Sequence, residues 1–137
     1  MESYIVNLHA IPSSKGNLVA LQNPESLSFA IKRIYYIYGV NSKGHRRGFH
    51  AHQKLEQVLI CVSGSVKILV KTPEEEQVFL LDNPSKGLFV GKMIWREMFE
   101  FTKNAILIVL ASEKYDEHDY FRSYDQYVAS FNKEKKI

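Results

Sequence analysis

The sequence predicts an all-β protein, an antiparallel sandwich or barrel, that ends in a short helix. Short segments rich in β-branched and aromatic residues recur along the chain with turn residues between them, a pattern typical of antiparallel sheets. Near the end, aromatic and apolar residues change to helical spacing. A chain of 137 residues suits one domain, residues 1–137, around one core.

The strands are expected where apolar segments lie between turns. In order, they are residues 5–8, 18–21, 31–38, 48–52, 56–62, 66–70, 77–81, 88–90, 95–99 and 105–111. Several lack polar alternation, as expected where both faces of a strand are covered. Turns rich in Gly, Asn, Ser and Pro are expected at 14–17, 41–44, 63–64 and 83–87.

The last element is expected to be an amphipathic helix capped by Asp119. Its apolar face consists of Tyr120, Phe121, Tyr124, Tyr127, Val128 and Phe131. This face predicts packing on the barrel, with a dimer contact or a substrate wall as alternatives.

Charge and composition exclude several classes of protein. The net charge of +3 comes largely from the terminal Lys133, Lys135 and Lys136, so no basic stripe indicates nucleic-acid binding. The lone Cys61 lies in an apolar segment and is expected to be a buried, inert thiol. No signal peptide is apparent, and the longest apolar segment, 105–111, is too short to cross a bilayer. We therefore expect a cytoplasmic protein without a membrane partner.

One motif dominates the middle of the chain: Gly44-x5-His50-x-His52-x3-Glu56-x7-Gly64. Residues two apart on a strand share a face, so His50 and His52 should project together. Two imidazoles and a nearby carboxylate suggest either a metal site or a pair of acid/base groups.

This motif resembles the first signature of the cupins, which implies a double-stranded β-helix, or jelly-roll barrel. The second cupin signature normally supplies another metal-binding histidine, but residues 84–96 contain none and offer Arg96 near that place. His50, His52 and Glu56 could still form a facial triad for iron(II). The fixed charge of Arg96 would repel such an ion and is better matched to an anionic substrate, so no metal or other cofactor is expected.

Further segments, in the same order, resemble the sugar nucleotide 3,4-ketoisomerases, which are cupins. They are residues 32–38, 47–52, 55–59, 90–98 and 111–125. The resemblance implies a metal-independent isomerase that acts on the dTDP-linked hexose dTDP-4-oxo-6-deoxy-D-glucose. It also implies a homodimer with an exchanged N-terminal strand.

The catalytic roles follow from that resemblance. His50 would move the proton between C3 and C4 of the hexose, since the pKa of histidine lies near the working pH. His52 would handle the oxygen protons or orient the ring, and Tyr36 would be a proton donor near the hexose.

The same resemblance suggests substrate-binding residues. Arg33 and Arg47 would bind the diphosphate, and Glu56 would orient a histidine or contact the sugar. Trp95 would cover the sugar or the thymine, with core packing as its alternative.

Two positions near the hexose differ between branches of the family that form gluco or galacto products. They are Arg96, which favours the gluco product, and Lys15, which fits neither branch. Two other functions stay open: a metal-dependent cupin dioxygenase and a non-catalytic sugar-binding cupin.

Overall fold

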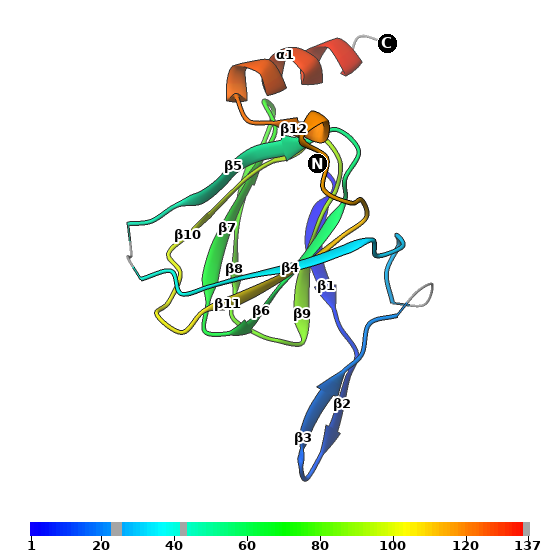
Figure 1. Ribbon diagram of the computed structural model, residues 1–137, viewed down its shortest axis with the longest axis vertical. Coiled ribbons are helices and arrows are strands. Elements are labelled where there is room, and N and C mark those ends of the chain that lie inside the picture. Colours follow the sequence, from blue (N-terminus) through cyan, green and yellow to red (C-terminus); the bar gives the residue numbers. More distant parts are fainter. Residues whose placement is uncertain (23–25, 42–43, 136–137) are drawn as a thin grey trace.

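The fold consists of two facing antiparallel sheets, with a hairpin at one end and a helix at the other (Figure 1). The computed structural model describes residues 1–22, 26–41 and 44–135. One sheet has the strand order β1-β9-β6-β11-β4 and the other the order β12-β5-β10-β7-β8. This arrangement confirms the predicted all-β class with a short terminal helix.

The elements follow the chain as β1 (Ser3–Asn7), β2 (Ala10–Ser13), β3 (Gly16–Val19), β4 (Arg33–Tyr38), β5 (Arg47–His52), β6 (Gln57–Ser63), β7 (Val66–Lys71), β8 (Glu76–Leu81), β9 (Lys86–Val90), β10 (Trp95–Phe99), β11 (Ile106–Ala111), a 3₁₀ turn (Glu117–Asp119), β12 (Tyr120–Phe121) and α1 (Tyr124–Lys135). The main core lies between the sheets and includes Leu59, Cys61, Ile68, Val70, Leu88, Met98, Leu107 and Val109. The buried Cys61 confirms its predicted place. No described helix is long and apolar enough to cross a membrane.

Every expected strand is present, the one at 95–99 with the expected ends and the others with shifted ends, and two more were not predicted. β2 pairs with β3, while β12 pairs Tyr120 with His52 and Phe121 with Ala51. The predicted helix start at Asp119 is therefore wrong. Its carboxylate accepts from the backbone amides of Lys54 and Leu55 instead, and α1 begins at Tyr124. Residues 42–43 of the expected turn lie outside the described residues.

The helix α1 covers the outer face of β5 and β10, as its apolar spacing predicted. Tyr127 is fully buried against Ala51, Met93 and Trp95. Its hydroxyl donates to the backbone oxygen of Met93 at 2.8 Å. The helix thus packs on the side of β10 that faces away from the other sheet.

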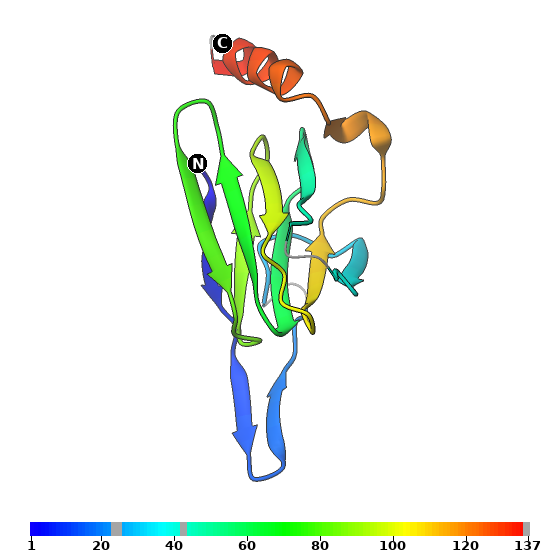
Figure 2. The ribbon, with the colours of Figure 1, turned by 90° about the vertical axis from the view of Figure 1, so that its left-hand side faces the viewer.

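The β2–β3 hairpin projects from the end of the molecule opposite α1 (Figures 1 and 2). Ile11 and Leu18 on this hairpin are exposed. A two-stranded hairpin is marginally stable alone in water.

Candidate active site

A bulge in β5 sets the direction of the two histidines. Gly48 and Phe49 have positive φ angles of 94° and 55°, and the pairing of β5 with β10 changes register between His50 and Gly48. A Cβ on Gly48 would lie 3.0 Å from the backbone oxygen of Arg96, so glycine permits this close approach. Beyond the bulge, Ala51 faces α1 while His50 and His52 face the barrel interior.

The two imidazoles form a buried pair with Tyr120. The side chains of His50 and His52 are 8% and 0% exposed, and their ring centroids lie 4.9 Å apart in an edge-on arrangement. The Tyr120 ring lies 5.2 Å from His50 and 4.3 Å from His52. The pair is therefore closed to bulk water on the side of β12.

Asp119 lies behind His52. Its Oδ2 is 3.3 Å from His52 Nδ1, although the two atoms are not aligned for a hydrogen bond. Because two backbone amides hold this carboxylate, it can orient the His52 ring without moving.

Burial keeps both histidines neutral. Desolvation, followed by the charge of Arg96, lowers the pKa of His50 to about 4. The same two causes hold the pKa of His52 far below its ordinary range. At neutral pH both rings are neutral imidazoles, so each has one nitrogen that carries a hydrogen and one that can accept a proton.

Arg96 is the buried cation of the site. Its side chain is fully buried, with Nη1 donating to Gln57 Oε1 at 2.5 Å and Nη2 donating to the backbone oxygen of Ile94 at 2.9 Å. Desolvation lowers the pKa of Arg96 to about 10, so the guanidinium remains charged at neutral pH. Gln57 also donates through Nε2 to the Tyr35 hydroxyl at 3.2 Å. Burial raises the pKa of Tyr35, which keeps this phenol protonated.

A pocket of about 210 Å³ opens onto His50. It is lined by Arg33, Tyr35, Ile37, Arg47, Gly48, His50, Met98, Tyr120 and Arg122. Three guanidinium groups around one small pocket favour an anionic ligand.

Unmet hydrogen-bonding capacity gathers at this pocket. Among the described residues, the buried side-chain nitrogens and oxygens without a hydrogen-bond partner are Arg33 Nη1, His50 Nε2, both ring nitrogens of His52, and Arg96 Nε. Buried polar atoms without partners are costly, and two of these, Arg33 Nη1 and His50 Nε2, belong to residues that line the pocket and are available to a ligand.

Arg122 builds the rim of the pocket from the segment after β11. Its guanidinium lies over the Tyr120 ring at 4.3 Å and donates twice to Glu117, at 2.6 and 2.8 Å. The sequence interpretation included this segment in the family resemblance and placed Tyr120 in its substrate-wall alternative. It gave no site role to Arg122, Asp119, Gln57 or Tyr35. The only sequence signal that could have pointed to these site residues was their charged, aromatic or amide side chains.

The structure brings Arg33, Arg47, His50, His52 and Arg96 together. It does not bring Tyr36 to them. Tyr36 lies on the other face of β4 from Arg33 and is 64% exposed. Tyr35 takes the inward position, because alternate residues of a strand point to opposite faces.

Three other expected residues also lie elsewhere. Trp95 is buried under α1 and donates from its indole nitrogen to Glu97, which matches its core-packing alternative. Glu56 lines a separate cavity with Lys32, Lys54 and Lys92, so it cannot complete a facial triad with the histidines. The described residues contain no group of three His, Cys, Asp or Glu suited to a metal. Lys15 lies in the turn of the projecting hairpin.

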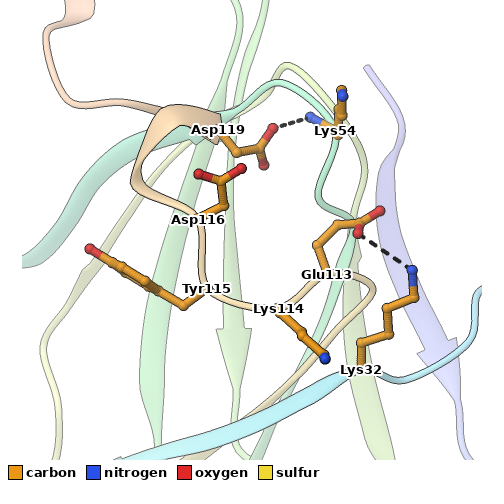
Figure 3. A pocket seen from close by; sticks show the side chains of 7 residues that line it. All are labelled: Lys32, Lys54, Glu113, Lys114, Tyr115, Asp116 and Asp119. Carbon is orange, nitrogen blue, oxygen red and sulfur yellow. Dashed lines mark hydrogen bonds and ion pairs between the residues drawn. The ribbon is translucent and has the colours of Figure 1, made fainter.

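A larger cavity of about 470 Å³ lies on the other side of Asp119 (Figure 3). Its lining charges are mixed: Lys32 pairs with Glu113 at 3.6 Å, and Asp119 is bound to the Lys54 amide. Neither histidine nor any of the pocket's arginines lines it. Size alone therefore does not make it the candidate site.

Comparisons with known proteins agree with this geometry. The model of the FdtA family, described as WxcM-like, C-terminal, matches residues 1–132. The TDP-4-oxo-6-deoxy-alpha-D-glucose-3,4-oxoisomerase of Aneurinibacillus thermoaerophilus is 44% identical over 99% of each chain.

Two crystal structures extend the likeness. One is the 3,4-ketoisomerase QdtA from Thermoanaerobacterium thermosaccharolyticum, as a histidine-to-asparagine variant in complex with TDP-4-keto-6-deoxyglucose. It is 46% identical with a TM-score of 0.92, over 96% of this chain and 94% of that one. The other is the TDP-quinovose 3,4-ketoisomerase WlaRB from Campylobacter jejuni. It is 43% identical with a TM-score of 0.88, over 93% of this chain and 98% of that one.

Proposed function

The chain belongs to the WxcM-like FdtA family and is a sugar nucleotide 3,4-ketoisomerase, and from this premise we propose how it acts. The substrate is TDP-4-keto-6-deoxyglucose, and the product is a TDP-3-keto-6-deoxyhexose. One observation carries the proposal. A neutral buried histidine with a free ring nitrogen lies in a small pocket lined by Arg33, Arg47 and Arg122.

His50 is the acid/base at carbon. Its neutral ring removes the C3 proton, which the neighbouring C4 ketone acidifies, and the electrons move into an enediolate. C4 then takes up a proton, and the carbonyl forms at C3. Since burial lowers the pKa of His50, the protonated intermediate is short-lived and gives up its proton readily.

The oxygens exchange a proton in the same direction, from position 3 to position 4. The O3 hydroxyl loses its proton as C3 becomes the ketone, and O4 gains one. His52, oriented by Asp119, accepts or relays this proton. Tyr35, in place of Tyr36, donates to the developing oxyanion, and Arg96 stabilises its charge.

Arg33 and Arg47 bind the diphosphate of the nucleotide. Both line the pocket mouth next to His50, and a planar guanidinium can give two parallel hydrogen bonds to a phosphate. Arg122 adds a third guanidinium at the rim. The cationic pocket therefore holds the sugar by its diphosphate and leaves the hexose over His50.

The active form is a homodimer. The projecting hairpin exposes Ile11 and Leu18, and the outer face of the edge strand β4 exposes Ile34, Tyr36 and Tyr38. Since β1 pairs with β9 of its own chain, the exchanged element is the β2–β3 hairpin. A second copy would cover both surfaces and carry Lys15 away from its own barrel.

The product has the gluco configuration. Arg96 stays charged and binds the enediolate oxygen without competing as a proton donor. For this product C4 must gain its proton on the face opposite to the one from which C3 lost its own, because H3 and H4 are trans on a gluco ring. The 3-keto group suits a later aminotransferase, which would make a 3-amino-3,6-dideoxyhexose for a surface glycan, and a cytoplasmic location follows from the sequence expectation.

The test is direct conversion. Purified protein is incubated with TDP-4-keto-6-deoxyglucose and followed by NMR, with His50→Asn as the matched variant. We expect loss of the C4 ketone and appearance of the C3 ketone with the wild-type protein only. An unchanged substrate with the folded wild-type protein would contradict the function, and full activity in His50→Asn would remove His50 from its role.

A further inference from the structure

Gln57 joins two groups of the site at the start of β6. Its side chain is fully buried. Oε1 accepts from Arg96 Nη1 at 2.5 Å, and Nε2 donates to the Tyr35 hydroxyl at 3.2 Å. One neutral amide thus connects the buried cation to the phenol that lines the pocket.

The chemistry of the partners dictates how this amide is oriented. A guanidinium donates hydrogen bonds and accepts none, so the Gln57 atom that faces Arg96 must be the oxygen. The NH₂ group therefore faces Tyr35, whose oxygen must accept. The Tyr35 hydrogen then cannot point at Gln57.

The surroundings leave that hydrogen for the pocket. Tyr120 is a neighbour of Tyr35, but its hydroxyl accepts from Arg33 Nη2 at 3.4 Å and no hydrogen bond joins these two described tyrosines. The cationic groups next to Tyr35 are Arg96 and Arg33, the latter with its Cζ 4.8 Å from the Tyr35 ring centroid. Both are donors only. The acceptor that fits this place is an oxygen of the bound keto sugar.

We propose that Gln57 is a positioning residue that makes Tyr35 a hydrogen-bond donor to the reacting sugar oxygen and leaves Arg96 its full charge. This inference rests on the proposed ketoisomerase function. A glutamate of the same shape would accept from both neighbours. It would turn the Tyr35 hydrogen away from the sugar and pair with Arg96, so the enediolate would lose a proton donor and much of a cation.

The substitution Gln57→Glu tests this directly. We expect kcat to fall by about 100-fold, the range of one general acid, while KM changes less than about threefold, because the diphosphate contacts are untouched. Tyr35→Phe should lower kcat in the wild-type background but add nothing in Gln57→Glu, where Tyr35 no longer donates. Gln77→Glu, on exposed β8, is the matched control and should behave as wild type.

Gln57→Leu separates positioning from simple support of the fold. It removes both hydrogen bonds but adds no charge, so Tyr35 can still donate and Arg96 stays unpaired. We expect kcat in the order wild type, Gln57→Leu, Gln57→Glu, with Tyr35→Phe still harmful in the leucine background. A purely structural role predicts leucine to be at least as harmful as glutamate.

Several results would overturn the inference. One is that the kcat of Gln57→Glu stays within about threefold of wild type. Another is that Tyr35→Phe has an equal effect in the wild-type and Gln57→Glu backgrounds. A third is that Gln57→Leu lowers kcat more than Gln57→Glu does. If Gln57→Glu does not fold, the leucine variant decides, and unchanged kcat there refutes the role. A wild-type protein inactive on TDP-4-keto-6-deoxyglucose refutes the function itself, whereas active wild type with active Gln57→Glu refutes only the inference.

Discussion

Lowering the pH from 7 to 5 should destabilise the protein by about 2 kcal/mol through His50 alone. Burial, followed by Arg96, lowers the pKa of His50 from 6.5 to about 4. The unfolded chain therefore binds this proton more tightly than the native state does. The contribution of His50 to stability is fully present above pH 6.5 and is lost as the pH falls toward 4.

The size follows from linkage. At pH 5, protonation of this one ring favours the unfolded state over the native state by a factor of about 30. This factor corresponds to the ~2 kcal/mol given above. Below pH 4 the full shift costs about 3 kcal/mol. For a domain of ordinary stability, this is a large part of the total.

The assay is urea denaturation at pH 7 and pH 5, at one protein concentration. His50→Asn keeps a similar size without titrating, so its unfolding free energy should fall less between the two pH values than that of wild type. His118→Asn, at a fully exposed ring, controls for the loss of a histidine without burial. Equal decreases of the unfolding free energy in wild type and His50→Asn would refute the reasoning, because they would mean that folding does not lower the pKa of His50.

Further predictions concern the chemistry. Tyr35→Phe should lower kcat by about 100-fold and Tyr36→Phe by less than about threefold; the opposite order would restore Tyr36 to the site. Arg33→Ala and Arg47→Ala should each weaken TDP binding by about 10- to 100-fold, because each loses a charge-assisted contact; unchanged affinity by calorimetry would make them surface residues. Turnover should survive a chelator, since the Arg96 guanidinium fills the barrel beside the histidines; activity lost to chelator and restored by one metal would contradict this. A large H3–H4 coupling in the amino sugar trapped by a 3-aminotransferase would match the gluco product, and a small one would refute the Arg96 stereochemistry.

Strand alternation predicted the histidine pair but not which aromatic residues join it. His50 and His52 share a face whichever way β5 is turned. On β4, each face offers one isoleucine and at least one tyrosine, Tyr35 with Ile37 on one side and Ile34 with Tyr36 and Tyr38 on the other, so hydropathy did not identify the inner face. On β10, hydropathy alone would put Trp95 inside and Arg96 outside, whereas the family resemblance placed Arg96 at the site. The barrel reverses this order, because its interior is a polar site and α1 buries the outer face.

The segment after β11 shows a second limit. Tyr120 and Phe121 fit helical spacing as well as strand spacing, and only the pairing with His52 and Ala51 decides between them. Such a pairing joins residues far apart in sequence, which local patterns do not report. Asp119 was likewise expected to cap a helix, whereas it binds the amides after β5.

That distant pairing ties activity to the completion of synthesis. His50 and His52 leave the ribosome long before Asp119, Tyr120 and Arg122, yet the pocket needs all five. A chain that stops short of β12 would expose both imidazoles to water, which raises their pKa values toward the ordinary range, and would lack the Tyr120 wall of the pocket. Prematurely terminated translation products should therefore be inert toward the reactive keto sugar, and isomerase activity should appear only in chains that are nearly complete.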